Sequence, residues 1–404
     1  MDYFFRTRPT AHGEIFGPAP HGNYQREKHR SAIDKCPAEV LTEIFLHYLT
    51  ERSRGSRIQQ LLCVCKLWNQ LLTNNPSLWT KITLSMQAMK PYGRGPHLHL
   101  VRKSIERSRN MPLDIEVNTA HVNPVTKGVE ECGDTCEAIV NLLVNNQHRW
   151  RTLRVMLPGA SGAWNTNKAI GKLLRGRAPN LVELSVRNFQ WRDQQRVTFS
   201  DLPRLRVLRI NGYAFVGLVR PLSIGSICRL DLDLSGFEVW AGRGRYTRWT
   251  KYVSRLESLR CLHLRYTRSL GPPPTRFSLQ GPIELPVLEE LGLWKVDILG
   301  LQFKLPALRT LEFDDLTFPK VNPTEVIWRC SWGDPAVTVT AGHLKHMIRR
   351  YPSAILFVLP CWTEHILAAA LRSIKAEDSH LTSTISFVKE TREGGRQPMD
   401  VNVE

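Results

Sequence analysis

The sequence predicts an α/β fold in which a small helical module precedes an irregular solenoid of repeated strands. Two patterns lead to this prediction. Between residues 36 and 79, apolar residues recur at helical spacing, and between residues 181 and 313 a six-residue pattern with leucine at its first, fourth and sixth positions returns several times. The chain has 404 residues, of which 42% are hydrophobic and 23% are charged, so most of it is expected to fold around a core.

Changes in composition divide the chain into six parts. The first part is rich in Gly, Pro, His and charged residues without any period, which predicts disorder. The predicted parts are a disordered N-terminal segment (1–32), a helical module (33–80), linking helices and a first strand (81–148), the repeat region (149–320), a C-terminal capping region (321–390) and a tail (391–404).

The first predicted helix carries apolar side chains around an unusually large part of its surface. At 100° per residue, the apolar positions cover about 180° of the helix. These positions include Val40, Leu41, Ile44, Phe45 and Leu49. A helix that packs only on its own core needs a stripe of roughly 100°, so the surplus predicts a second partner.

A second helix is predicted after a loop at residues 51–57. Its apolar face consists of Ile58, Leu61, Leu62, Cys65, Trp68 and Leu72. It should end before Pro76, because the residue before a proline is pushed out of helical geometry. Leu78 and Trp79 follow as apolar plugs. A module as short as residues 33–80 is marginal for a single core, which again favours a permanent partner.

These landmarks resemble the F-box, the adaptor-binding module of Skp, cullin, F-box (SCF) ubiquitin ligases. The matching residues are Pro37, Glu39, Val40, Leu41, Ile44, Phe45, Leu49, Val64, Cys65, Lys66, Trp68, Pro76, Leu78 and Trp79. Cys36 stands where the family usually has leucine. The resemblance covers about an eighth of the chain. It implies a receptor that binds a Skp-type adaptor and, through it, a cullin and a RING subunit.

On this resemblance we assign twelve residues to adaptor binding. They are Cys36, Pro37, Val40, Leu41, Ile44, Phe45, Leu49, Leu62, Cys65, Trp68, Leu78 and Trp79. The target itself would be a protein bound by the repeat region. Leucine-rich repeats commonly follow the F-box in fungal members of the family, so the resemblance also fits the pattern farther along the chain.

Five segments carry the leucine-rich pattern L-x-x-L-x-L. They contain Leu181, Leu184 and Val186; Leu205, Leu208 and Ile210; Leu259, Leu262 and Leu264; Leu288, Leu291 and Leu293; and Leu308, Leu311 and Phe313. Weaker copies lie near Leu153 and Leu230. One such strand cannot complete a core alone, so neighbouring units must stack, which predicts an irregular leucine-rich-repeat-like solenoid.

Some repeat units share a Leu-Pro lead, and other predicted elements flank the repeat on both sides. Leu-Pro precedes three units, at residues 202–203, 285–286 and 305–306, and proline is expected at the start of a strand because it cannot donate to the ladder. On the N-terminal side, residues 97–117 predict a helix and then a strand from Leu113. On the C-terminal side, residues 339–360 predict a helix and a strand that cap the array, and the tail predicts one more strand.

Residues between the buried leucines should point away from the core. They are Arg154, Arg187, Arg209, Asn211, His263 and Arg265, followed by Trp294, Glu312 and Asp314. This predicts a face that is basic over most of its length and acidic at its far end, or simply solvated strand polarity. The residues assigned to target binding are Arg187, Arg209, Asn211, Trp240, Arg243, Arg245, His263, Arg265 and Trp294.

Residues 237–252 interleave aromatic and basic side chains. Such a segment suits single-stranded nucleic acid, because bases stack on aromatic rings while arginine neutralises phosphate. It equally suits a protein-recognition loop. We favour a packed loop between repeats that leads into a helix, with Trp249, Val253 and Leu256 facing the core.

Net charge supplies the alternative function. The chain carries +18, of which +14 lies in residues 81–319. A regional excess of this kind indicates an acidic partner, either a protein or a polyanion. A nucleic-acid-binding repeat scaffold is therefore the alternative to a ubiquitin-ligase receptor, and we favour the receptor.

Cysteine usage and hydropathy predict where the protein resides. Nine cysteines at irregular spacing indicate a reducing compartment. The N-terminus does not have the pattern of a secretory signal, and the most apolar stretch, residues 353–363, is shorter than the roughly twenty residues of a membrane span. We expect a soluble protein of the cytoplasm or nucleus without membrane contact.

The sequence predicts neither catalysis nor a metal or cofactor. The pairs Cys63 and Cys65, Cys132 and Cys136, His97 and His99, and His343 and His346 do not supply four convergent ligands. The chain also has no nucleophile elbow, phosphate-binding glycine loop or zinc-protease motif. A non-catalytic subunit is expected.

Overall fold

The computed structural model describes just over half of the chain, in separate stretches. These are residues 36–49, 54–85, 96–118, 133–156, 171–187, 198–211, 226–234, 252–265, 283–294, 303–313, 323, 325–328, 341–351, 354, 356–360, 364–377, 386–390 and 396–398. The segment predicted to be disordered (1–32) lies outside them, as do Trp240, Arg243, Arg245 and Asp314.

The chain falls into two compact units, Met1–Tyr48 and Leu49–Glu404. In the first unit the structure describes helix α1 (Ala38–Tyr48), which begins directly after Pro37, where the backbone N–H of Leu41 donates to the Pro37 carbonyl oxygen at 3.0 Å. No helix of the described stretches, in either unit, is long and apolar enough to cross a bilayer.

The second unit opens with two helices where the sequence predicted one. They are α2 (Arg54–Leu62) and α3 (Lys66–Asn74), so α2 also takes up part of the loop predicted at 51–57. The helix predicted from Ile58 to Leu72 is interrupted because Cys65 is extended and its Sγ accepts the Trp68 backbone N–H at 3.5 Å, which caps α3. As predicted, α3 ends before Pro76.

The remaining elements are short helices toward the two ends of the described chain and a run of strands, from Trp150 to Trp328, between them. The helices are η2 (Pro76–Trp79), α4 (Pro96–Arg107), α5 (Gly133–Val144), η5 (Gln147–Arg149), α9 (Ala341–Arg350) and α10 (Glu364–Glu377). The strands of the main sheet are β1 (Lys81–Ser85), β2 (Leu113–Asn118), β3 (Trp150–Met156), β5 (Glu183–Arg187), β7 (Val207–Asn211), β8 (Arg229–Asp233), β9 (Cys261–Arg265), β11 (Glu290–Trp294), β13 (Thr310–Phe313), β14 (Glu325–Trp328), β15 (Leu356–Pro360), β16 (Ser386–Glu390) and β17 (Arg396–Pro398).

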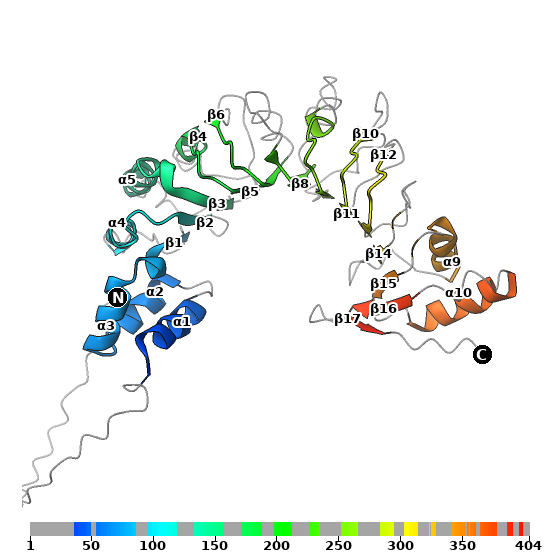
Figure 1. Cartoon of the computed structure of the whole chain (residues 1–404), viewed down its shortest axis with the longest axis horizontal. Helices are drawn as coiled ribbons and strands as arrows, with labels where there is room; N and C mark the ends of the chain where they lie inside the picture. The colour runs from blue at the N-terminus through cyan, green and yellow to red at the C-terminus, as the bar shows by residue number, and fades with distance from the viewer. Residues whose placement is uncertain are drawn as a thin grey trace, which may run out of the picture. The chain divides into compact units, whose positions relative to one another are not determined.

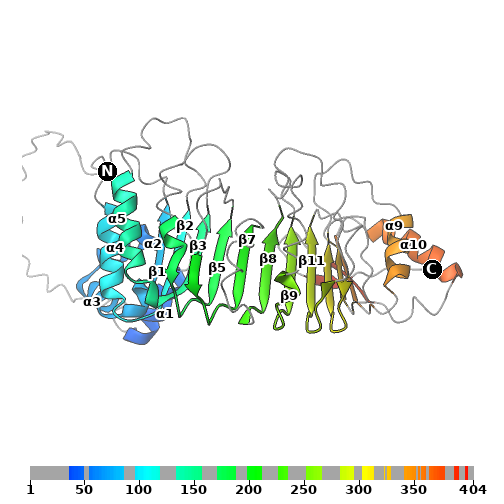
Figure 2. The same cartoon turned by 90° about the horizontal axis from the view of Figure 1, so that it is seen from above.

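Sheet order follows chain order across all 13 strands, and Figure 2 shows β3, β5, β7, β8 and β9 side by side in that sequence. Every neighbouring pair from β1 to β16 is parallel, and only β17 is antiparallel to its neighbour. The described stretches of residues 81–148 contain two strands, β1 and β2, where the sequence predicted one.

Two smaller sheets accompany the main one. They pair β4 (Arg175–Arg177) with β6 (Thr198–Asp201), and β10 (Ile283–Glu284) with β12 (Phe303–Lys304). Figure 1 shows these four strands, together with α4 and α5, on one side of the main sheet. The opposite face of the main sheet carries the side chains that alternate with the core residues along each strand.

A tight turn leads into each of the repeated strands. In each of the three Leu-Pro units, one hydrogen bond closes a four-residue turn that begins and ends with leucine. The backbone N–H of Leu205 donates to the Leu202 carbonyl at 3.2 Å, and that of Leu288 donates to the Leu285 carbonyl at 3.3 Å. Each proline therefore occupies the second position of the turn, where its fixed φ is favourable, and not the start of a strand as predicted. Equivalent turns are closed by the Leu181 N–H, which donates to the Ala178 carbonyl, and by the Leu259 N–H, which donates to the Leu256 carbonyl.

The leucines of the repeat form the core. Register aligns Leu184, Leu208, Leu230, Leu262, Leu291 and Leu311 side by side, and none of them is exposed. The core continues to the helix and strand predicted at the C-terminal end, where the rings of Phe357 and Phe387 stack at 5.6 Å. Helix α10 was not predicted.

Candidate functional site

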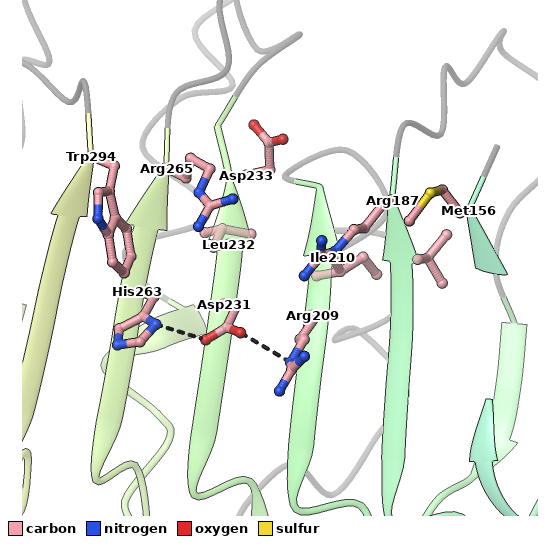
Figure 3. Close-up of a pocket in the computed structure, with 11 residues that line it drawn as sticks. Met156, Arg187, Arg209, Ile210, Asp231, Leu232, Asp233, His263, Arg265 and Trp294 are labelled. Carbon is pink, nitrogen blue, oxygen red and sulfur yellow. Dashed lines mark ion pairs between the residues drawn. The ribbon is translucent and has the colours of Figure 1, made fainter. Parts of the chain in front are cut away.

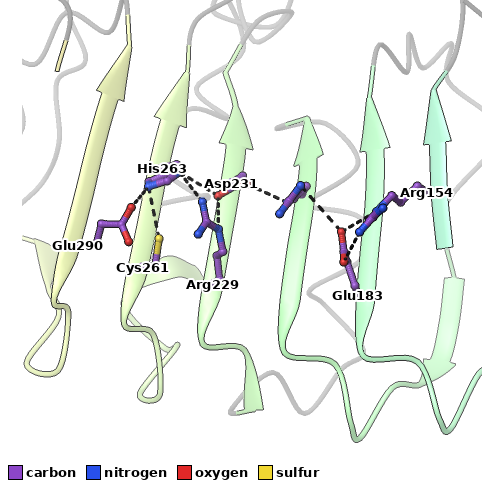
Figure 4. Close-up of polar contacts among 8 residues, drawn as sticks. Arg154, Glu183, Arg229, Asp231, Cys261, His263 and Glu290 are labelled. Atoms are coloured by element: carbon purple, nitrogen blue, oxygen red, sulfur yellow. Dashed lines mark hydrogen bonds and ion pairs between the residues drawn. The ribbon is translucent and has the colours of Figure 1, made fainter. Parts of the chain in front are cut away.

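The face of the main sheet opposite the leucine core carries a row of polar residues (Figure 4). Parallel, in-register strands bring equivalent positions side by side. The row consists of Arg154, Ser185, Arg209, Asp231, His263 and Glu312, with Gly292 between the last two, so that each of seven adjacent strands contributes one residue.

Carboxylates separate the arginines of this row. Arg154 makes a forked pair with Glu183, with both N–O distances at 2.9 Å. Arg209 lies 3.0 Å from Asp231 and 3.9 Å from Glu183, so it is held between the two. The forked geometry favours specific orientation of the Arg154 guanidinium.

His263 continues this series of charged contacts at a largely buried position, with 9% of its surface exposed. Its Nδ1 lies 3.2 Å from Asp231, and its Nε2 lies 2.6 Å from Glu290 and 3.4 Å from the Cys261 Sγ. Arg229 lies 3.2 Å from Asp231. We refer to Arg154, Glu183, Arg209, Arg229, Asp231, His263 and Glu290 as the ion-pair ladder.

The ladder corrects the predicted charge of this face. The sequence predicted either a face that is basic over most of its length and acidic at its far end, or ordinary solvated strand polarity, and it placed His263 among the outward residues. The structure instead places Glu183, Asp231 and Glu290 among the arginines, and His263 is buried. The positions of these carboxylates beside the arginines depend on which strands are neighbours and at what register, which the leucine pattern alone does not specify. At the far end, Glu312 is buried.

Burial and charge act against each other on the ladder carboxylate Asp231. Burial opposes its ionisation, but the hydrogen bond and charge of His263, with the charges of Arg229 and Arg209, outweigh burial and hold the pKa of Asp231 below its usual value. Burial, with the nearby Glu290 carboxylate, raises the pKa of the Cys261 thiol well above its ordinary value, so this thiol stays protonated.

The lowered pKa of Asp231 predicts acid sensitivity. A carboxylate whose pKa is lower in the folded than in the unfolded state contributes stability above about pH 4, and this is lost as pH falls through the folded pKa. We therefore expect Asp231→Asn to lower the free energy of unfolding at neutral pH, with the difference from the parent chain shrinking below about pH 4. Urea unfolding of both proteins from neutral pH to below about pH 4 measures this difference in the free energy of unfolding. Glu257→Gln, at an exposed position, is the control, and a difference that stays constant with pH would contradict the account.

Among the described residues, two groups of side chains have the donor chemistry for a metal ion. They are Asp231, Cys261 and His263, and His263, Glu290 and Glu312, with donor atoms within 4.8 Å of one another in each group. Both nitrogens of the shared His263 are already in contact with ladder residues, and Arg229 lies 3.1 Å from Nδ1. A metal ion would have to displace these contacts.

A pocket adjoins the ladder at the carboxyl ends of the central strands (Figure 3). Five of the residues predicted to bind the target line it, namely Arg187, Arg209, His263, Arg265 and Trp294. Asn211 belongs to β7 but not to this lining, and Trp240, Arg243 and Arg245 lie outside the described residues. The lining also contains Met156, Asp231 and Asp233, which sequence reasoning missed.

A second surface lies on α1. Val40, Ile44 and Tyr48 follow one another at intervals of four residues and are 47%, 50% and 43% exposed. Leu41 and Phe45, on the neighbouring stripe, are buried. The helix thus has one apolar stripe inside and another in solvent, as its wide apolar circumference predicted.

Apolar side chains are also exposed where α2 joins α3. Val64 is 57% exposed and Leu67 is 38% exposed. The turn itself is well fixed, because the Asn69 side-chain amide donates to the Leu62 carbonyl at 3.0 Å. At the other end of α3, the Trp79 indole N–H donates to the Leu72 carbonyl at 2.6 Å. Exposed apolar groups on a fixed turn are typical of a protein-binding surface.

Comparison with known families bears on this part of the chain. Residues 33–85 match the F-box-like family. The chain contains an F-box-like domain. This supports an F-box protein and the binding of a Skp-type adaptor, and it suggests an SCF substrate receptor. A search of curated proteins found no match to the chain.

The residues predicted to bind the adaptor differ in exposure within the F-box-like domain. Pro37, Val40, Ile44 and Cys65 are exposed; Cys36, Leu62 and Trp68 are half-buried; and Leu41, Phe45, Leu49, Leu78 and Trp79 are buried. Tyr48, Val64 and Leu67 are exposed apolar residues that were not assigned to adaptor binding.

Proposed function

We propose that this protein is the substrate receptor of an SCF-type ubiquitin ligase. The F-box-like domain would bind a Skp-type adaptor, and the adaptor would join the receptor to a cullin and a RING subunit. The observation that carries the proposal is the exposed stripe of Val40, Ile44 and Tyr48 within a segment that matches the F-box-like family. Leaving three large apolar side chains of one helix in contact with water costs free energy, and a binding partner that covers them removes this cost.

The main sheet would hold the protein target. We propose that it is an irregular leucine-rich-repeat-like solenoid, as in fungal members of the family, which is supported by strand order that follows chain order and by the recurring turn. The receptor would have no catalytic step of its own and would act in the cytoplasm or nucleus. Its contribution would be effective concentration, because a target lysine held near the ubiquitin thioester meets it far more often than by free diffusion.

Adaptor binding by the α1 stripe has a direct test. Val40→Asp with Ile44→Asp places two charges on the exposed stripe, and each apolar side chain buried in an interface contributes about 1.5–3 kcal/mol, so we expect binding at least roughly a hundredfold weaker. The full chain is co-expressed with a Skp-type adaptor and passed over a sizing column, where the parent chain should elute with the adaptor and the double variant should not.

Glu43→Ala changes an exposed residue of the same helix and should leave co-elution unchanged. Circular dichroism of both variants checks that they remain folded. If the parent chain elutes free of the adaptor, or if the double variant co-elutes like the parent, the proposed receptor function is wrong.

A further inference from the structure

Two arginines at the rim of the pocket differ from those of the ion-pair ladder. Arg187, at the end of β5, and Arg265, at the end of β9, are exposed and form no ion pair with any residue that the structure describes. In Figure 3 they lie on either side of Asp233, which is next to Arg265 in the sheet register. The two guanidinium groups are therefore available to an external anion.

An aromatic wall closes one end of the pocket. The Trp294 ring meets the His263 ring edge-on at a centroid distance of 4.6 Å, and the Arg265 guanidinium lies 5.1 Å from the Trp294 ring centre. Gly292 makes room for this arrangement, because a Cβ there would approach within 2.5 Å of the Trp294 ring and 2.7 Å of the His263 ring. Trp and Arg are the residues that most often dominate binding energy in protein interfaces.

The floor beneath the rim is held in place by the ladder. Asp231 joins Arg209 to His263, and Glu290 holds the far nitrogen of His263. A site whose side chains are already fixed loses little conformational entropy when a ligand binds. The lining thus combines a rigid polar floor, two available cations and an apolar wall.

The spacing of the arginines indicates the size of the ligand. Arg187 and Arg265 are separated by three strand intervals, which is about 14 Å between their Cα atoms. An extended polypeptide covers this distance in about four residues. A continuous polyanion laid across the same strands would meet the carboxylates of Asp231 and Asp233 between the two arginines, and these charges disfavour a further anion there.

We propose that this pocket binds an extended segment of the target polypeptide that carries anionic side chains toward the two rim arginines and an apolar side chain against Trp294. The inference rests on the proposed receptor function and names the chemical class of its target. Arginine can hold a carboxylate or a phosphate with two parallel hydrogen bonds, so Asp, Glu or a phosphorylated residue would satisfy each rim position. Asp231 and Asp233 disfavour a further anion between them.

Selection from a random peptide library on the purified full chain tests the proposal. We expect selected peptides to be rich in Asp or Glu beside apolar residues, and each of Arg187→Glu and Arg265→Glu to weaken their binding about tenfold or more, as loss of a charge-assisted hydrogen bond implies. Trp294→Ala and Gly292→Ala should also weaken binding. Arg206→Glu, at an exposed position outside the pocket, should not.

Further arms separate the sources of the anion. A selected peptide is resynthesised with phosphoserine at its acidic positions, and tighter binding would identify phosphorylated targets. A labelled single-stranded oligonucleotide that binds in its place, with the same dependence on Arg187 and Arg265, would overturn the proposal in favour of nucleic acid. The proposal would also be overturned if no peptides were selected or if the selected peptides lacked acidic residues. It would be overturned as well if acidic peptides bound both variants as tightly as they bind the parent chain.

The parent chain is also co-expressed with the adaptor, so that adaptor binding and peptide binding are measured on the same unsubstituted protein. Intact adaptor binding without peptide binding would remove only the pocket proposal. Peptide binding without adaptor binding would instead remove the receptor function.

Discussion

Leu208→Ala should destabilise the protein by about 2–5 kcal/mol, the range for removing a fully buried leucine side chain. Leu208 is not exposed, and the register places it between Leu184 and Leu230 in the middle of the main sheet. The cavity would open between three adjacent strands of one continuous core. Urea unfolding of the full chain, followed by tryptophan fluorescence, measures the change.

Val207→Ala is the matched control on the same strand. Val207 is only partly buried because alternate residues of a strand face opposite sides of the sheet, so the loss should be below about 1.5 kcal/mol. Equal losses at the two positions would show that the leucine row is not the core.

Arg149→Ala should destabilise the protein by about 2–4 kcal/mol, because a buried cation donates several hydrogen bonds at once. Arg149 is 8% exposed, and its guanidinium donates to the Met111 carbonyl at 3.0 Å and to the Ser108 Oγ at 2.6 Å. It also donates to the Ile105 carbonyl at 3.4 Å, at the C-terminal end of α4, where a positive charge is favourable. Substitution would remove the donor to the buried Ser108 Oγ and to the Met111 carbonyl, while the Ile105 carbonyl would keep the hydrogen bond that it accepts from the Ser108 hydroxyl.

Arg151→Ala serves as the comparison. Arg151 is an exposed arginine that pairs with Asp114, and exposed ion pairs contribute about 0–1 kcal/mol. Thermal unfolding of both variants distinguishes the two roles. A shift for Arg149→Ala no larger than that for Arg151→Ala would show that the Arg149 contacts contribute little.

Apolar spacing was sufficient to predict much of the main sheet. Leucines at alternate positions specify both a strand and the face that it buries, so β5, β7, β9, β11 and β13 were predicted from the repeat alone. Strands with fewer leucines, such as β1, were not. Nor was the break between α2 and α3, because Cys65 fits the apolar period of a continuous helix while its sulfur caps a new one.

The pocket could be predicted only in part. Arg187, Arg265 and Trp294 occupy outward positions that the repeat itself identifies, so their placement on one face follows from the sequence. The pairing of Arg209 with Asp231, and of His263 with Glu290, depends on which strands are neighbours and at what register. The same holds for Gly292, whose importance appears only when the Trp294 ring is seen to occupy the space above it.

Hydrogen–deuterium exchange of the full chain with and without a Skp-type adaptor tests the central claim most directly. If the exposed stripe of α1 is the adaptor-binding surface, exchange in residues 38–48 should slow when the adaptor is added, while strands β5 to β11 should be unaffected. A complex that protects the sheet and leaves residues 38–48 unchanged, or an adaptor that protects no part of the chain, would contradict the account.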